Sequence, residues 1–197
     1  MDRKPATTEV PINELIAERW SPRAYSDVPV SRADVQSVLE AARWAPSAYN
    51  MQPWRFVVFE RAVDDVAFSR AFATLVPFNQ RWNASAQALI AVTAHTLTPD
   101  GEANPTALYD AGAAAFSLVL QAHALGLAAH QMSGFDTDRF RTEFAIPDDV
   151  EVITMISLAH YGDHAALGDD LRELESAERT RLPLGEIAYH GAWRQTT

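Results

Sequence analysis

The sequence predicts a single domain that combines α-helices with β-strands, and three observations support this prediction. The chain has 197 residues, the size of one domain, and 48 % of them are hydrophobic, enough to build a core. Segments with helical patterns alternate with segments rich in strand-forming residues. No repeat or low-complexity tract interrupts the alternation. We therefore expect an α/β or α+β domain that spans residues 1–197, with residues 1–11 as a flexible N-terminal arm.

Two helices are predicted in the first quarter of the chain. Ile12–Arg19 has a short helical pattern. The second helix is expected to begin at Ser31, because Ser31 and Asp34 have the spacing of a capping box, in which side chains satisfy free N–H groups of the first turn. It should stop at Pro46, since proline cannot continue a helix. Four apolar residues share one face of this helix: Val35, Val38, Leu39 and Ala42.

The middle of the chain alternates predicted strands and helices. Trp54–Phe59 is apolar and rich in residues that favour strands, so it is expected to be a buried strand. Leu89–Ala94 is a second strand candidate. A helix is predicted near Val66–Leu75, and Pro77 is assigned to a polar turn that follows it.

The longest predicted helix is Leu108–Leu125, with Gly126 as a candidate C-terminal cap. Its sequence is apolar on nearly every side, a pattern typical of a helix buried in the core or packed against another subunit. Val150–Leu158 is predicted to be a third strand. The tail is charged and helical from Asp169 and becomes apolar again at Leu182–Ile187.

The composition and the absent motifs exclude several classes of protein. The chain has 26 acidic and 16 basic residues, a net charge of −10, which argues against sequence-independent nucleic-acid binding. It has no cysteine, so disulfides, thiolate metal sites and cysteine nucleophiles are excluded. It contains neither G-x-G nor G-x-S-x-G, which removes the dinucleotide fingerprint and the nucleophile elbow of α/β-hydrolases.

Metal and membrane sites are not expected either. His160 and His164 have a metal-ligand spacing, but Tyr161-Gly162-Asp163 between them is typical of a turn. The first residues lack the apolar core of a signal peptide, and no apolar stretch approaches the roughly 20 residues of a membrane helix. These features predict a cytoplasmic protein without a membrane or nucleic-acid partner.

Two clusters of arginines are candidates for an anion site. Arg19, Ser21 and Arg23 alternate in a stretch that follows the first helix, so in an extended chain their side chains face the same way. Arg179 and Arg181 form a second alternating pair. Since arginine makes bidentate contacts with phosphate, the clusters indicate a bound phosphate. The alternative is that each arginine pairs with one of the abundant carboxylates, and the spacing alone does not decide between them.

The segment Ala45–Trp54, between the second helix and the first strand, is a second candidate site. Two prolines fix its backbone, and Ser47, Asn50 and Gln52 carry hydroxyl and amide groups that suit the edge of a heteroaromatic ring. The residues by themselves favour the simpler alternative, a connection whose polar side chains satisfy the backbone of a turn.

In combination these motifs resemble the FMN-dependent nitroreductase family over nearly the whole chain. P-S-x-x-N-x-Q-P-W at residues 46–54 is the most specific motif, and the others are weak individually but occur in the family's order. They are R-x-S-x-R at 19–23, the long helix closing on Leu125-Gly126-Leu127, Ser133-Gly134-Phe135, and Arg179-x-Arg181-Leu182-Pro183.

The resemblance implies an α+β fold whose central, mostly antiparallel sheet is flanked by helices, in an intertwined homodimer. Two FMN molecules would lie at the subunit interface, and each would touch both chains. NAD(P)H would deliver a hydride to flavin N5, and a nitroaromatic, quinone or similar acceptor would then take the electrons in a ping-pong mechanism. No catalytic side chain and no metal is implied, because flavin N5 carries the chemistry.

Matching the motifs position by position assigns roles to individual residues. Arg19 and Ser21 would bind the FMN phosphate, and Arg179 and Arg181 would complete that site. Arg23 would reach the flavin ring near N1 and the C2 carbonyl, where reduced flavin gathers negative charge.

The remaining candidate residues surround the flavin ring and the ribityl chain. Ser47 and Asn50 would contact the ring or the ribityl chain, and the backbone at Ser133-Gly134 would hydrogen-bond near N5. Neighbouring positions of the same motifs complete the candidate cofactor-binding set: Trp20, Pro46, Gln52 and Met132.

The segment Leu97–Thr106 leaves the substrate class open, because many relatives carry a longer helical excursion there that covers the flavin. One alternative is a redox enzyme of the same scaffold, such as a reductive dehalogenase, an enone reductase or a flavin destructase. Another is a protein that binds FMN as a sensor or a store, without turnover.

Overall fold

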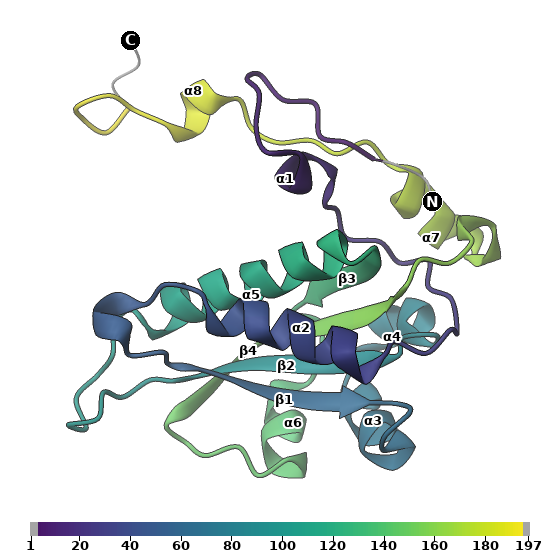
Figure 1. Ribbon diagram of the computed structural model, residues 1–197, viewed down its shortest axis with the longest axis horizontal. Helices are drawn as coiled ribbons and strands as arrows, with labels where there is room; N and C mark the ends of the chain where they lie inside the picture. The colour runs from purple at the N-terminus through teal and green to yellow at the C-terminus, as the bar shows by residue number, and fades with distance from the viewer. Residues whose placement is uncertain (1–3, 195–197) are drawn as a thin grey trace.

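The computed structural model describes residues 4–194, which contain one four-stranded sheet (Figure 1). The strand order is β1-β2-β4-β3, and every neighbouring pair is antiparallel. The strands are β1 (Trp54–Glu60), β2 (Ala88–His95), β3 (Leu127–Met132) and β4 (Val150–His160). Helices flank both faces of the sheet, so the predicted α+β class is confirmed.

The central strands β2 and β4 form the buried middle of the sheet. Every residue from Ala88 to Ala94 is buried, and so is every residue from Met155 to Ala159. The predicted strand at Trp54–Phe59 is confirmed, but the expectation that it is buried is only partly right. β1 lies at the edge of the sheet, where one side of a strand has no neighbour, and only Trp54 and Phe59 of its residues are buried.

Helices α2 (Arg32–Arg43) and α5 (Ala107–Ala124) cover one face of the sheet (Figure 1). The predicted cap of α2 is confirmed: the Ser31 hydroxyl accepts from the Asp34 N–H at 3.1 Å and donates to the Asp34 carboxylate at 2.7 Å. The predicted end of α5 is confirmed as well, because Gly126 takes a positive φ of 74° that suits a glycine.

The opposite face carries α3 (Asp65–Phe72), α4 (Pro77–Asn83) and α6 (Thr137–Glu143), which enclose a second core rich in aromatic rings. The prediction of a polar turn at Pro77 is wrong. Pro77 is the first residue of α4, a position where its missing N–H costs no helical hydrogen bond. Neither α6 nor β3 has a counterpart among the sequence predictions.

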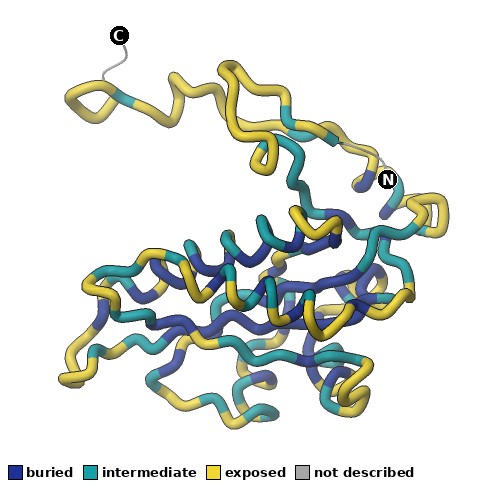
Figure 2. The backbone as a smooth tube through the Cα atoms, in the orientation of Figure 1, coloured by how far each residue is buried: buried dark blue, intermediate teal, exposed yellow. Residues whose placement is uncertain are grey.

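The two ends of the chain lie side by side and extend away from the sheet as largely exposed segments (Figures 1 and 2). The Ala6 N–H donates to the Ala17 carbonyl at 2.8 Å, and the Leu184 N–H donates to the Glu9 carboxylate at 3.1 Å. Residues 1–3 of the predicted N-terminal arm lie outside the described residues. These end segments contain α1 (Glu14–Glu18), η2 (His164–Ala166), α7 (Asp169–Ser176) and α8 (Leu184–Ile187), and the 3₁₀ helix η1 (Ala48–Asn50) lies between α2 and β1.

In the described part of the chain, no helix combines the length and the apolar character that crossing a membrane requires.

Candidate functional site

The two arginine clusters meet in space although they stand about 160 positions apart. Arg19 follows α1, and its Nη1 lies 3.4 Å from the Ser21 hydroxyl oxygen. Burial lowers the pKa of Arg19, and the nearby positive charges of Arg179 and Arg181 lower it further. The chain therefore holds three guanidinium groups close enough to repel one another.

Among the described residues, no carboxylate forms an ion pair with this cluster. Arg179 Nη1 donates to the backbone carbonyls of Lys4 and Ala17, each at 2.6 Å, and Arg181 Nη1 donates to the carbonyl of Thr180. Within residues 4–194 none of the three arginines forms an ion pair with a carboxylate. Of the two interpretations of the clusters, this geometry favours the anion site, because a bound phosphate would offset the repulsion.

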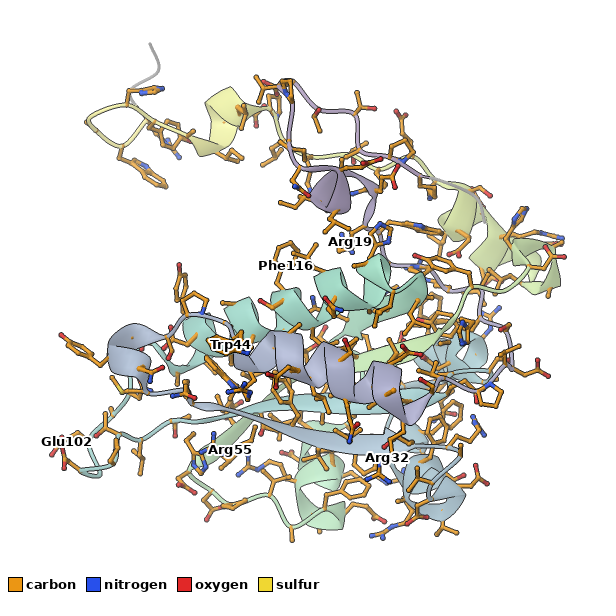
Figure 3. All side chains as sticks on the ribbon, viewed as in Figure 1. Arg19, Arg32, Trp44, Arg55, Glu102 and Phe116 are labelled. Atoms are coloured by element: carbon orange, nitrogen blue, oxygen red, sulfur yellow. The ribbon has the colours of Figure 1, made fainter. Side chains whose placement is uncertain are left out.

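A cavity of about 410 Å³ opens beside the three arginines. Phe116 of α5 forms part of its wall, and Figure 3 shows Arg19 above α5 next to Phe116. Most of the remaining wall is apolar and comes from both ends of the chain: Val10, Ile12, Ile16, Leu182, Leu184 and Ile187. Glu9 also lines the cavity, and its carboxylate accepts a hydrogen bond from the Leu184 N–H instead of pairing with an arginine. A cavity with charged groups among apolar walls suits a ligand that joins a phosphate to a hydrophobic body.

Arg23 lies on the far side of the same loop, over the ring of Trp82 at 5.9 Å. Its Nε is buried and has no hydrogen-bond partner among the described residues. Buried guanidinium nitrogens are normally hydrogen-bonded, so this atom marks a place that a polar group of a ligand could occupy.

His130 packs against the same loop and has no counterpart among the predicted site residues. Its Nδ1 lies 3.0 Å from the Pro22 carbonyl oxygen, and its ring lies 4.5 Å from that of Trp82. Burial lowers the pKa of His130 to about 4, and the positive charges of Arg23 and Arg19 act in the same direction. The ring is therefore neutral at pH 7 and donates its Nδ1 proton to the carbonyl, which can only accept.

The turn at residues 46–52 forms a second, strained region. It contains the 3₁₀ helix η1 (Ala48–Asn50), whose first N–H donates to the Asp110 carboxylate of α5 at 3.2 Å. Tyr49, Asn50 and Gln52 have φ values of 50°, 55° and 47°, a region that side chains other than glycine seldom adopt. Such strain is concentrated at functional sites.

The polar side chains of this turn have different roles. The Ser47 hydroxyl accepts from the Gln52 N–H at 3.1 Å, and the Gln52 amide donates to the Asn50 carbonyl at 3.0 Å. Ser47 and Gln52 therefore support the turn, as the simpler alternative predicts. The Asn50 side chain is exposed and makes no hydrogen bond within residues 4–194, so it is available to a ligand.

The third region lies at the end of β3, where Met132 is buried and Ser133 is exposed. The Gly134 carbonyl accepts from the Val76 N–H at 3.0 Å and from the Asn79 amide at 2.9 Å. A Cβ atom at Gly134 would lie 2.5 Å from the Asn79 amide nitrogen, so this packing requires glycine.

Comparison with known proteins places the chain in a family. The family model for the nitroreductase family matches residues 16–160. The chain belongs to the nitroreductase family. A protein of Archaeoglobus fulgidus, provisionally named NADH dehydrogenase/NAD(P)H nitroreductase, is 30 % identical over 76 % of this chain and 85 % of its own length.

Solved structures of this family agree with the assignment. A crystal structure described as an oxidoreductase containing FMN has a TM-score of 0.92 and 35 % identity, and the match covers 100 % of both chains. A protein of Desulfovibrio desulfuricans, provisionally named a nitroreductase and solved in complex with FMN, has a TM-score of 0.73 and 27 % identity. That match covers 94 % of this chain and 99 % of the other.

In a single chain of this nitroreductase-family protein, the predicted site residues lie in separate places. Arg19, Arg179 and Arg181 line one cavity, whose walls include neither residues 46–52 nor residues 132–134. In Figure 1, η1 lies at the N-terminal end of α5, whereas α1 lies over the other half of that helix. Trp20 is turned toward a different cavity of about 250 Å³, with the Lys4 ammonium 4.7 Å from its ring.

Proposed function

We propose that this protein is an FMN-dependent oxidoreductase that works as a homodimer. It passes a hydride from NAD(P)H through flavin N5 to a nitroaromatic, a quinone or a similar acceptor. The observation that carries the proposal is the convergence of Arg19, Arg179 and Arg181 on one cavity, where no carboxylate of residues 4–194 forms an ion pair with them. Its family relatives include crystal structures described as containing FMN, which supports the same cofactor here.

The residues present fit the two ends of FMN. The phosphate carries a charge near −2, so it would pair with the guanidinium groups of Arg19, Arg179 and Arg181, and the Ser21 hydroxyl would donate to it. The buried Nε of Arg23 has no hydrogen-bond partner within residues 4–194 and would find an acceptor at the N1 and C2-carbonyl edge of the ring. FMN, when bound, supplies the hydride-transfer chemistry at N5.

The side chains of the protein orient the cofactor and tune its environment. A positive charge from Arg23 near N1 favours the reduced ring, which carries negative charge there. The neutral His130 ring fixes the loop through Pro22 without adding a second charge. Asn50 and the backbone of Ser133-Gly134 would hold the ribityl chain and the ring edge near N5.

A second copy of the chain would bring the separate regions together. The outer face of α5 exposes Leu108, Tyr109 and Phe116, with exposed fractions of 52 %, 81 % and 40 %. The C-terminal segment adds Leu182, Leu184 and Ile187, which are also exposed. Apolar surface of this extent is typical of an interface. In a homodimer the turn at residues 46–52 of one chain would face the arginine cavity of its partner.

The length of the loop at residues 97–106 supports the proposed substrate class. Residues 97–106 form a short loop closed by the bridge between Leu97 and Ala103, and the loop contains no helix. A flavin whose cover is this small would accept planar aromatic acceptors of varied shape, which favours nitroaromatics and quinones.

Anaerobic mixing with NADH or NADPH tests the proposal. The purified protein should be yellow, should release FMN on denaturation, and should lose its flavin absorbance on mixing and regain it on addition of a quinone. A colourless protein that FMN cannot reconstitute would refute the proposed cofactor. Bound FMN that neither nucleotide reduces would instead indicate a sensor or a store.

A further inference from the structure

Glu175 of α7 is a buried carboxylate whose role the proposed function does not explain. Glu175 is only 5 % exposed. Its Oε1 and Oε2 accept from the Arg23 N–H at 3.0 and 2.9 Å, and its Oε1 also accepts from the Ala24 N–H at 3.1 Å. The carboxylate therefore binds the backbone of the arginine loop from a helix about 150 positions away.

The backbone around Glu175 joins the same loop to both ends of the chain. Lys4 Nζ donates to the carbonyls of Glu175 and Ala177, at 2.5 and 2.6 Å. Arg179 in turn donates to the carbonyls of Lys4 and Ala17, the latter within α1 just before Arg19. Three segments of the chain thus meet beside the guanidinium groups that would bind phosphate.

A carboxylate is an unusual choice for this position, because burial of a charge is costly unless the group is paired and hydrogen-bonded. Residues 19–24 belong to none of the four strands of the sheet, so no ladder satisfies the N–H groups of Arg23 and Ala24. Glu175 satisfies both of them. A hydrophobic side chain would fill the same space but would leave two buried donors without an acceptor.

We propose that Glu175 is a positioning residue for the cofactor phosphate: it fixes the backbone at Arg23 and Ala24, and thereby holds the loop from Arg19 to Arg23 in its binding conformation before the ligand arrives. This inference rests on the proposed function, since it needs FMN as the ligand. Preorganisation of this kind increases affinity because the loop loses little conformational freedom on binding. The effect should be larger for a ligand with a phosphate, because the loop that Glu175 fixes carries Arg19 and Ser21 at the phosphate as well as Arg23 at the ring.

The variant Glu175→Gln tests the inference, because the amide keeps one acceptor oxygen and the shape of the side chain. Glu173→Gln is a matched control with the same charge change on an exposed residue of the same helix. Affinities of the flavin-free proteins for FMN and for riboflavin, which lacks the phosphate, are measured by flavin fluorescence. We expect Glu175→Gln to weaken FMN binding about tenfold and riboflavin binding by clearly less, through Arg23 alone, and we expect Glu173→Gln to change neither.

Each other outcome has a definite meaning. Glu175→Gln with unchanged FMN affinity, or with equal losses for FMN and riboflavin, would overturn the positioning role. A wild-type protein that binds FMN no better than riboflavin would instead refute the phosphate site of the proposed function. If Glu175→Gln does not fold, hydrogen exchange of the flavin-free wild-type protein decides: slow exchange at the N–H groups of Arg23 and Ala24 supports the role, and fast exchange contradicts it.

Discussion

Replacing Arg19 with methionine tests whether this side chain serves to bind phosphate or to stabilise the fold. Methionine keeps the length and the apolar stem of the side chain and removes the charge. Arg19 contributes little to the structure through hydrogen bonds, since its contact with the Ser21 hydroxyl is 3.4 Å long. Its guanidinium group is therefore free to bind the ligand that we propose.

The expected magnitude follows from the hydrogen bond to phosphate that methionine cannot donate. One charge-assisted hydrogen bond to phosphate is worth about 1.5–3 kcal/mol, so the Kd for FMN should rise about 10- to 150-fold. The flavin-free protein should behave differently. Burial lowers the pKa of Arg19, and repulsion from Arg179 and Arg181 lowers it further, so removing the charge relieves both costs. The Tm of the flavin-free variant should therefore equal or exceed that of the wild type.

Fluorescence titration gives the Kd and thermal unfolding of the flavin-free protein gives the Tm. Arg181→Met serves as a second variant at the same cavity, and Arg32→Met, at an exposed position on α2 that is labelled in Figure 3, serves as the control. If Arg19→Met and Arg181→Met both bind FMN as tightly as Arg32→Met does, the phosphate site does not lie at this cavity.

Three further predictions concern stability and assembly. The pKa of His130 is about 4 in the folded protein and 6.5 in the unfolded chain. The neutral ring therefore makes its full contribution to folding stability above pH 6.5, and this stability is lost as the pH falls toward 4. Urea unfolding should show that His130→Gln loses up to about 3 kcal/mol less stability than the wild type between neutral and acid pH. If the stabilities of the variant and the wild type fall equally with pH, the burial argument is wrong. Gly134→Ala should cost about 1–3 kcal/mol in chemical unfolding, because the new Cβ overlaps the Asn79 amide, whereas Gly185→Ala meets nothing within 4 Å and should cost less. Phe116→Glu should convert the dimer to a monomer, as measured by light scattering, because it places a charge in the proposed interface. Val66→Glu is the control, on the opposite side of the sheet, and should remain a dimer. If both variants are dimers, the interface lies elsewhere.

Features that depend on neighbouring residues could be predicted from the sequence. The capping pair of Ser31 and Asp34, the end of α5 at Gly126 and the strand-forming segments that became β1, β2 and β4 all follow from local preferences. Pro77 could not be assigned in this way, because a proline suits a turn and the first position of a helix equally well. β3 (Leu127–Met132) lacks β-branched residues and becomes a strand through its pairing with β4.

The residues by themselves indicate two arginine clusters, at 19–23 and 179–181, and do not show that the clusters meet. The resemblance to the family implies one shared phosphate site, and the fold places Arg19, Arg179 and Arg181 on one cavity. His130 and Glu175 were missed because single histidines and glutamates carry no signal. Their importance comes from burial against a loop more than 100 positions away in the chain.

The central claim is that each FMN is bound by two chains, and a mixed dimer tests it most directly. One chain carries Arg19→Met and Arg181→Met, which disable the arginine cavity. The other carries Asn50→Ala, which removes the exposed amide of the strained turn. The two are co-expressed with different tags, and the mixed dimer is purified through both tags.

A site shared between chains predicts that the mixed dimer contains one intact site in two. The mixed dimer should bind about half as much FMN as the wild type, and NADH should reduce this FMN. The comparison is made at an FMN concentration at which the dimers of either parent variant bind much less. If the mixed dimer binds no more FMN than the average of its two parents, each site lies within one chain and the shared arrangement is wrong.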